Sequence, residues 1–168
     1  MLSLTIDIFE LARKCETLEG EMPLEDMPEL AKVVSALDKG GVIFTVEGLG
    51  TLREYPAVRL SIAGTATMTC ARCNKPVSVP FTNELTFILT KSEEEADKIP
   101  LDEDDEGQDV TVGSRQFKLN EWIQEETLLT LPLAATHESC EAEYNNPKDE
   151  DVPHNNPFAA LAGLKKLN

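Results

Sequence analysis

The sequence has few aromatic residues, few basic residues and no long hydrophobic run. Aromatic side chains make up 5% of the 168 residues, which predicts a core of modest size. Fifteen lysines and arginines stand against 31 acidic residues, so the net charge is −16. This charge excludes a protein whose whole surface binds nucleic acid through its phosphates. No apolar run approaches the ~20 residues that cross a bilayer, so we expect no membrane contact.

Sequence signatures of secretion and of catalysis are also missing. Asp7 and Glu10 stand where a signal peptide needs an apolar core, which favours a cytoplasmic protein. The glycines form neither of the common phosphate-binding patterns, and there is no GxSxG motif. Only two histidines are present, both near the C-terminus. We therefore expect no enzyme, with a nuclease or a thiol oxidoreductase as the alternatives.

Two helices are predicted near the N-terminus. Asp7 can cap a helix whose apolar stripe runs from Ile8 to Leu18, and Gly20 follows as its stop. A second apolar stripe at helical spacing predicts another helix over residues 25–37.

From residue 42 the hydrophobic pattern alternates, as in strands that are covered on one face. The alternating runs cover residues 42–46, 58–68 and 77–89. Only residues 70–76 separate the last two runs, which predicts an antiparallel pair. The fold class is therefore α+β: an antiparallel β-meander with a CxxC hairpin, flanked by N-terminal helices and a C-terminal helix.

The remaining segments define the domain organisation. Residues 91–109 hold ten acidic residues against two lysines, which predicts a mobile acidic loop. Asn120 can then cap a helix that ends before Pro132, with Glu125 and Glu126 expected at its surface. We expect a single domain over residues 1–140 and a flexible acidic linker over residues 141–156.

A short amphipathic helix is predicted over residues 157–168. Its apolar stripe, formed by Phe158, Leu161 and Leu164, would dock either on the domain or on a partner.

Four side chains form a candidate zinc site. Cys70 and Cys73 have the spacing of a zinc knuckle, in which a tight turn directs two thiolates at one point. His137 and Cys140 have the same two-residue gap and would complete a Cys3His site. Two alternatives stay open. The first CxxC pair could be a redox pair, activated by Arg72 and Lys75, or it could bind no metal.

Three stretches of the sequence resemble one known family. They are Thr69-Cys-Ala-Arg-Cys-Asn-Lys-Pro76, Glu126-Thr-Leu-Leu-Thr-Leu-Pro132 with His137 and Cys140 after it, and Asn156-Pro-Phe-Ala-Ala-Leu-Ala-Gly-Leu-Lys165. Their order and spacing resemble the bacterial YceD family, the large ribosomal RNA subunit accumulation proteins. The resemblance implies a cytoplasmic protein needed for accumulation or processing of large-subunit ribosomal RNA in ribosome biogenesis, without catalytic residues. Family members often carry a second cysteine pair where this chain has His137 and Cys140.

The sequence suggests two ways in which an acidic protein could act on ribosomal RNA, either by direct contact or through a protein partner. Four basic residues would form a local RNA-contacting patch if they share a face, namely Arg53, Arg59, Arg72 and Lys75. Alternatively, the acidic residues 102–106 would hold a basic ribosomal protein, as an acidic chaperone or assembly factor does.

Overall fold

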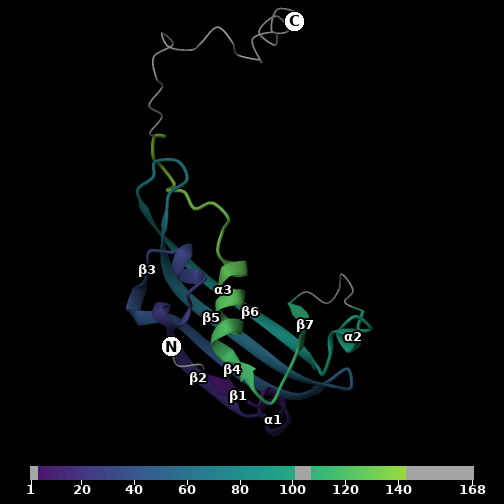
Figure 1. Cartoon of the computed structure of the whole chain (residues 1–168). Coiled ribbons are helices and arrows are strands. Elements are labelled where there is room, and N and C mark those ends of the chain that lie inside the picture. The colour runs from purple at the N-terminus through teal and green to yellow at the C-terminus, as the bar shows by residue number, and fades with distance from the viewer. Residues whose placement is uncertain (1–3, 101–106, 143–168) are drawn as a thin grey trace, which may run out of the picture.

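A computed structural model describes residues 4–100 and 107–142 of the chain (Figure 1). Within these residues the chain forms a curved six-stranded sheet, a small two-stranded sheet and three α-helices. The strands are β1 (Thr5–Ile6), β2 (Thr17–Pro23), β3 (Ala36–Leu37), β4 (Gly41–Leu52), β5 (Tyr55–Thr69), β6 (Pro76–Thr90), β7 (Gln108–Val112) and β8 (Phe117–Lys118). The α-helices are α1 (Ile8–Lys14), α2 (Glu93–Ala96) and α3 (Leu119–Thr130), and the 3-10 turns are η1 (Leu24–Asp26), η2 (Leu30–Lys32) and η3 (Asp38–Gly40).

The large sheet has the strand order β2-β4-β5-β6-β7, and the short β3 also pairs with β5. Strands β2, β4, β5 and β6 pair antiparallel, whereas β7 joins β6 in parallel. The predicted α+β class and the alternating runs at 58–68 and 77–89 are confirmed as β5 and β6. The parallel strand β7 is an addition to the predicted meander, made possible by the long connection through α2.

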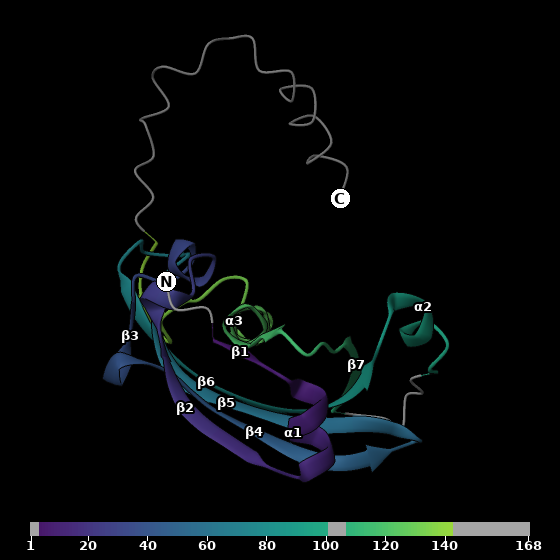
Figure 2. The same ribbon diagram turned by 60° about the horizontal axis from the view of Figure 1, so that its bottom comes forward.

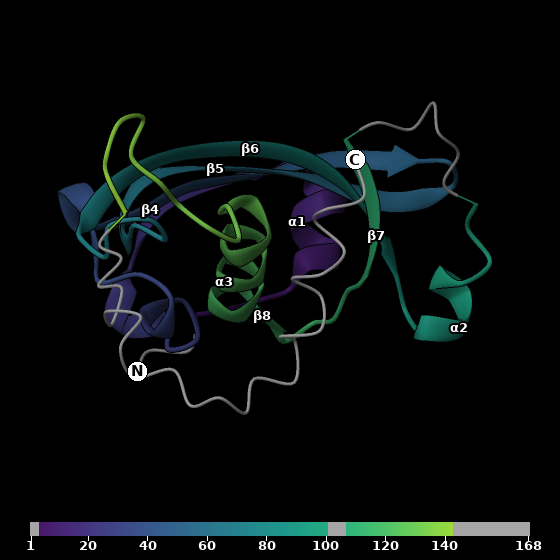
Figure 3. The ribbon, with the colours of Figure 1, turned by 90° about the horizontal axis from the view of Figure 1, so that it is seen from above.

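The sheet is bowed, and α1 and α3 lie on its concave side (Figures 2 and 3). Apolar side chains of β4, β5 and β6 alternate inward toward these helices, which explains the period of two in their sequences. The ring of Trp122 on α3 meets Phe87 of β6 edge to face at 4.9 Å and Phe117 of β8 at 5.2 Å. These contacts fix α3 against the sheet.

The first predicted helix is confirmed only over its N-terminal part. Asp7 caps α1 as expected, accepting a hydrogen bond of 3.0 Å from the backbone N–H of Glu10. The helix ends at Lys14 because Cys15 takes a left-handed conformation with φ 52°. Leu18 and Gly20 belong to β2 instead, and Gly20 leaves room there for the ring of Phe44.

The second predicted helix, over residues 25–37, is wrong. The segment forms η1, η2 and the short strand β3. Leu30 and Val34 are buried as the stripe predicts, but Val33 from the same stripe is 47% exposed. The side-chain oxygen of Gln124 on α3 accepts hydrogen bonds from the backbone N–H groups of Glu29 and Leu30, at 2.7 and 3.4 Å. This tertiary contact holds η2 in place of a continuous helix.

Part of the predicted acidic loop is regular structure. Ser92 caps α2, and β7 begins at Gln108, so both ends of residues 91–109 belong to secondary elements where the structure describes them. The predicted cap at Asn120 is wrong as well. Helix α3 begins at Leu119 after Lys118, and Asn120 lies in its first turn.

Several predicted segments lie outside the described residues. These are the acidic residues 102–106, the linker beyond residue 142 and the C-terminal helix with Phe158, Leu161 and Leu164. Within the described part of the chain, no helix is long and apolar enough to cross a membrane.

Candidate metal centre

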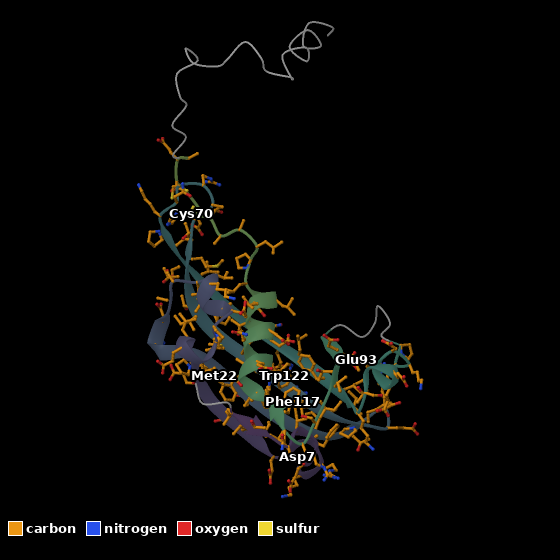
Figure 4. The ribbon with its side chains drawn as sticks, in the orientation of Figure 1. Asp7, Met22, Cys70, Glu93, Phe117 and Trp122 are labelled. Carbon is orange, nitrogen blue, oxygen red and sulfur yellow. The ribbon has the colours of Figure 1, made fainter. Side chains whose placement is uncertain are left out.

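Cys70 and Cys73 lie in the connection between β5 and β6, at one end of the sheet (Figure 4). The last pair of the ladder is Thr69 with Pro76, so six residues make the turn. The backbone N–H of Cys70 donates to the carbonyl of Lys75 at 2.9 Å, and Asn74 donates back to the carbonyl of Cys70 at 2.9 Å. Asn74 has φ 56°, a conformation that asparagine tolerates better than most residues. The turn brings both thiols to one side of the strand ends.

The second ligand pair lies in the segment that follows α3. After α3 the chain continues in the direction of the helix to the tip of β5 and β6, as Figure 1 shows. There the backbone N–H of Ala71 donates to the carbonyl of Ala135 at 2.8 Å, and the guanidinium of Arg72 donates to the carbonyl of Cys140 at 3.3 Å. These bonds place His137 and Cys140 beside the turn.

The four predicted ligands meet at one point. Their ligand atoms all lie within 4.8 Å of one another. The Sγ atoms of Cys70 and Cys140 are 3.8 Å apart, and Cys73 Sγ lies 3.4 Å from His137 Nδ1. Tetrahedral zinc with Zn–S bonds of 2.3 Å would separate two sulfurs by about 3.8 Å. The same 3.8 Å is far longer than the ~2.05 Å of a disulfide, and all four cysteines are free. The cluster could therefore hold a metal ion.

A backbone carbonyl orients the ring of His137 toward the cysteines. His137 Nε2 lies 3.0 Å from the carbonyl oxygen of Pro76 and can donate to it, which leaves Nδ1 as the lone-pair donor facing Cys73. The carbonyl of Pro76 is a contact that the sequence did not reveal, because it depends on how the second pair folds back.

The thiols of Cys70 and Cys140 differ in their pKa. Burial raises the pKa of the Cys70 thiol, but the backbone N–H groups of Cys73, Arg72 and His137 outweigh it and lower the pKa below its usual value. For Cys140, burial raises the pKa, and the neighbouring Cys70 and Cys73 raise it further. A thiolate at Cys70 is the form that binds a metal cation, and a bound cation would also favour the thiolate at Cys140.

The predicted basic patch does not form. Arg53 lies in the turn between β4 and β5, whereas Arg72 and Lys75 lie at the opposite end of β5. A strand of 15 residues covers about 45 Å, which is too far for one local patch. Arg59, midway along β5, pairs with Glu47 at 3.1 Å and lies 3.9 Å from Glu84. The four residues are therefore spread along an extended strand and do not make one local patch, and their contact with RNA stays a prediction.

Glu126 on α3 is a buried acid that the sequence suggested should be exposed. The residue is only 8% exposed. Burial, followed by the nearby carboxylates of Asp109 and Glu125, raises its pKa to about 6. The apolar residues near Glu126 in the sequence indicated a buried helix face. A glutamate on a helix is nevertheless far more often at the surface.

A family model describes proteins similar to this chain. The model of the large ribosomal RNA subunit accumulation protein YceD matches residues 58–165. The chain belongs to the YceD family. The match confirms the resemblance seen in the sequence, and it spans most of β5, all of β6 and α3, and all four residues of the candidate metal centre. The family name links its members to the accumulation of large-subunit ribosomal RNA. No solved structure matches this chain.

Proposed function

We propose that this YceD protein is a non-catalytic factor that supports accumulation, processing or stability of large-subunit ribosomal RNA during ribosome biogenesis. The observation that carries the proposal is the family match over residues 58–165. The chemistry of the cysteine and histidine cluster supports a structural role for this region, because four protein ligands leave no open position for a substrate or a reactive water.

We further propose zinc as the ion held by Cys70, Cys73, His137 and Cys140. Three sulfurs and one imidazole nitrogen suit zinc, whereas magnesium and calcium prefer oxygen ligands. Bound there, the ion would stabilise the fold by joining the β5–β6 turn to the segment after α3, and it would supply no chemical step.

A thiol-redox function is the weaker candidate. A lowered pKa at Cys70 would suit a nucleophilic thiol. Its side chain, however, is 0% exposed, so a partner disulfide cannot reach the sulfur without opening the turn.

The arrangement of charge favours a protein partner over direct phosphate contact. The net charge of −16 repels RNA, and the basic candidates are dispersed and engaged with carboxylates or carbonyl groups, as for Arg59 and Arg72. Positively charged ribosomal proteins would instead be attracted to this surface.

Depletion of the protein in growing cells tests the proposed function. We expect the ratio of large- to small-subunit ribosomal RNA to fall, with recovery on expression of the wild-type chain. Cys73→Ser should fail to restore the ratio, whereas His137→Cys should restore it because four cysteines also bind zinc. Cys15→Ser, which removes an exposed thiol away from the cluster, serves as the matched control.

Two results would contradict the proposal. One is a normal ratio of the two RNAs in depleted cells. The other is cleavage of precursor RNA by the purified protein alone, which would make it a nuclease.

A further inference from the structure

A cavity of about 470 Å³ lies along β7, between α2 and α3. Its floor includes Val110, Thr111 and Val112, which are consecutive residues of β7. Side chains of a strand alternate between its two faces, so a cavity that contacts three consecutive residues runs along the strand's edge. We call this cavity the β7 groove.

Among the described residues, the edge of β7 that borders the β7 groove has no strand beside it. In the part of the chain that the structure describes, β7 stands last in the sheet and pairs only with β6. An edge of this kind presents backbone N–H and C=O groups in a row, and these groups can pair with an added strand.

The walls of the β7 groove carry negative charge. Glu93 of α2 lies on one side of the groove, and Glu121 and Glu125 of α3 lie on the other. Figure 4 labels Glu93 on the first side and Trp122 of α3 on the second. Lys118 pairs with Glu121 at 2.7 Å, which neutralises one of the three carboxylates. Trp122 also lines the groove and is 5% exposed, and its indole N–H has no hydrogen-bond partner among the described residues.

We propose that the β7 groove binds an extended, lysine- or arginine-rich segment of a basic protein, which pairs with β7 as an additional strand. The proposal rests on the function proposed above, because it specifies the chemistry of the partner. Backbone pairing would give affinity, while carboxylates on both walls would select basic side chains. A nucleic acid is disfavoured, because its phosphates would face the same carboxylates.

A labelled peptide tests the proposal on the purified full chain. The probe is a fluorescein-labelled nonapeptide of alternating lysine and threonine, and its binding is followed by fluorescence anisotropy. The control peptide has the same sequence with alternate backbone nitrogens methylated, so its charge is kept while one row of N–H donors is lost. If β7 pairs with the probe, methylation should weaken binding by about tenfold or more.

Two double variants separate the β7 groove from general charge attraction. Glu93→Gln with Glu125→Gln removes two carboxylates from the groove and should weaken binding of the probe about tenfold. Glu19→Gln with Glu21→Gln removes two exposed carboxylates from β2, the strand at the other end of the sheet, and should leave binding within about twofold. Both variants change the net charge by the same amount.

Four results would overturn the proposal: equal binding of the methylated peptide, equal losses in the two double variants, tighter binding of a ribosomal RNA oligonucleotide, and a dimer of the wild-type chain that dissociates in the groove variant. The last result would assign the groove to a second copy of the chain. The depletion experiment tests the ribosomal function separately. If the peptide-binding test fails but depleted cells show a reduced ratio of large- to small-subunit ribosomal RNA, only the peptide-binding role of the β7 groove is rejected.

Discussion

At the scale of single residues, Glu126 makes stability depend on pH. Its pKa is raised from 4.5 to about 6 by burial and by the carboxylates of Asp109 and Glu125. The folded chain therefore holds this proton more tightly than the unfolded chain does, and the ionised form is penalised by folding. The contribution of the neutral acid is fully present below about pH 4.5 and is lost as the pH rises through about 6.

We expect Glu126→Gln to be more stable than the wild type at pH 7.5, by about 1 kcal/mol, because the amide carries no charge to bury. The gain should shrink as the pH falls toward 5. Urea denaturation across this pH range measures it, with the exposed Glu19→Gln as the control. A gain that stays constant with pH would show that the carboxylate does not titrate in this range.

At the scale of elements, the contact between α1 and β4 depends on Gly48. A Cβ atom at this position would lie 2.2 Å from the backbone oxygen of Leu11 and 3.1 Å from the Cα of Ala12. Since backbone atoms cannot move aside as a side chain can, Gly48→Ala should push α1 off the sheet. The expected loss of stability is about 1–3 kcal/mol, as for other overpacked sites.

Gly64→Ala is the matched control for this element. Gly64 also lies in a strand of the same sheet, but a Cβ there would meet the ring of Phe81 at 2.7 Å, and a ring can rotate away. Urea midpoints should therefore fall further for Gly48→Ala than for Gly64→Ala. The reverse order would mean that α1 tolerates displacement from β4.

At the scale of the whole molecule, the proposed zinc ion would join the tip of the sheet to the segment after α3. We expect one zinc ion per wild-type chain by elemental analysis, and none in Cys140→Ser. Chelation should speed amide hydrogen exchange in residues 70–76 and 131–142. Amides of β4 and β5 should stay protected, because the ring contacts of Phe87, Trp122 and Phe117 lie in β6, α3 and β8, outside the turn and the segment that carry the ligands.

Cys15→Ser is again the control and should keep its zinc, because Cys15 lies outside the cluster. A chelated protein whose exchange rises equally throughout would show that the ion stabilises the entire fold. A protein purified without metal, whose exchange is unaffected by added zinc, would contradict the assignment of the ion.

The long strands were predictable from the sequence because each is covered on one face. Apolar and polar residues therefore alternate along each strand. The helical pattern over residues 25–37 was misleading, because Leu30 and Val34 are buried without a continuous helix and the backbone of Glu29 and Leu30 bonds to Gln124 of α3 instead. Strand β7 could not be predicted as a partner of β6, since its five residues carry little pattern and the pairing is set by a distant crossover.

The candidate ligands were predictable because cysteine and histidine are rare here and occur in matching pairs. The supporting contacts, such as the Pro76 carbonyl beside His137, were not predictable, because they join positions 61 residues apart. The basic patch failed for a related reason. Sequence shows which side chains are charged, but the length of β5 and the pairing of Arg59 with Glu47 decide whether they act together.

The separation of the two ligand pairs along the chain also sets the order of events during synthesis. Strands β5 and β6 can pair as soon as residue 90 leaves the ribosome, whereas the cluster is incomplete until Cys140 has emerged. At a translation rate of about 5–20 residues per second, the first two thiols wait several seconds for the other ligands. Capture of the proposed ion would therefore follow the assembly of the sheet, and a bound ion would mark a chain that has been made through residue 140.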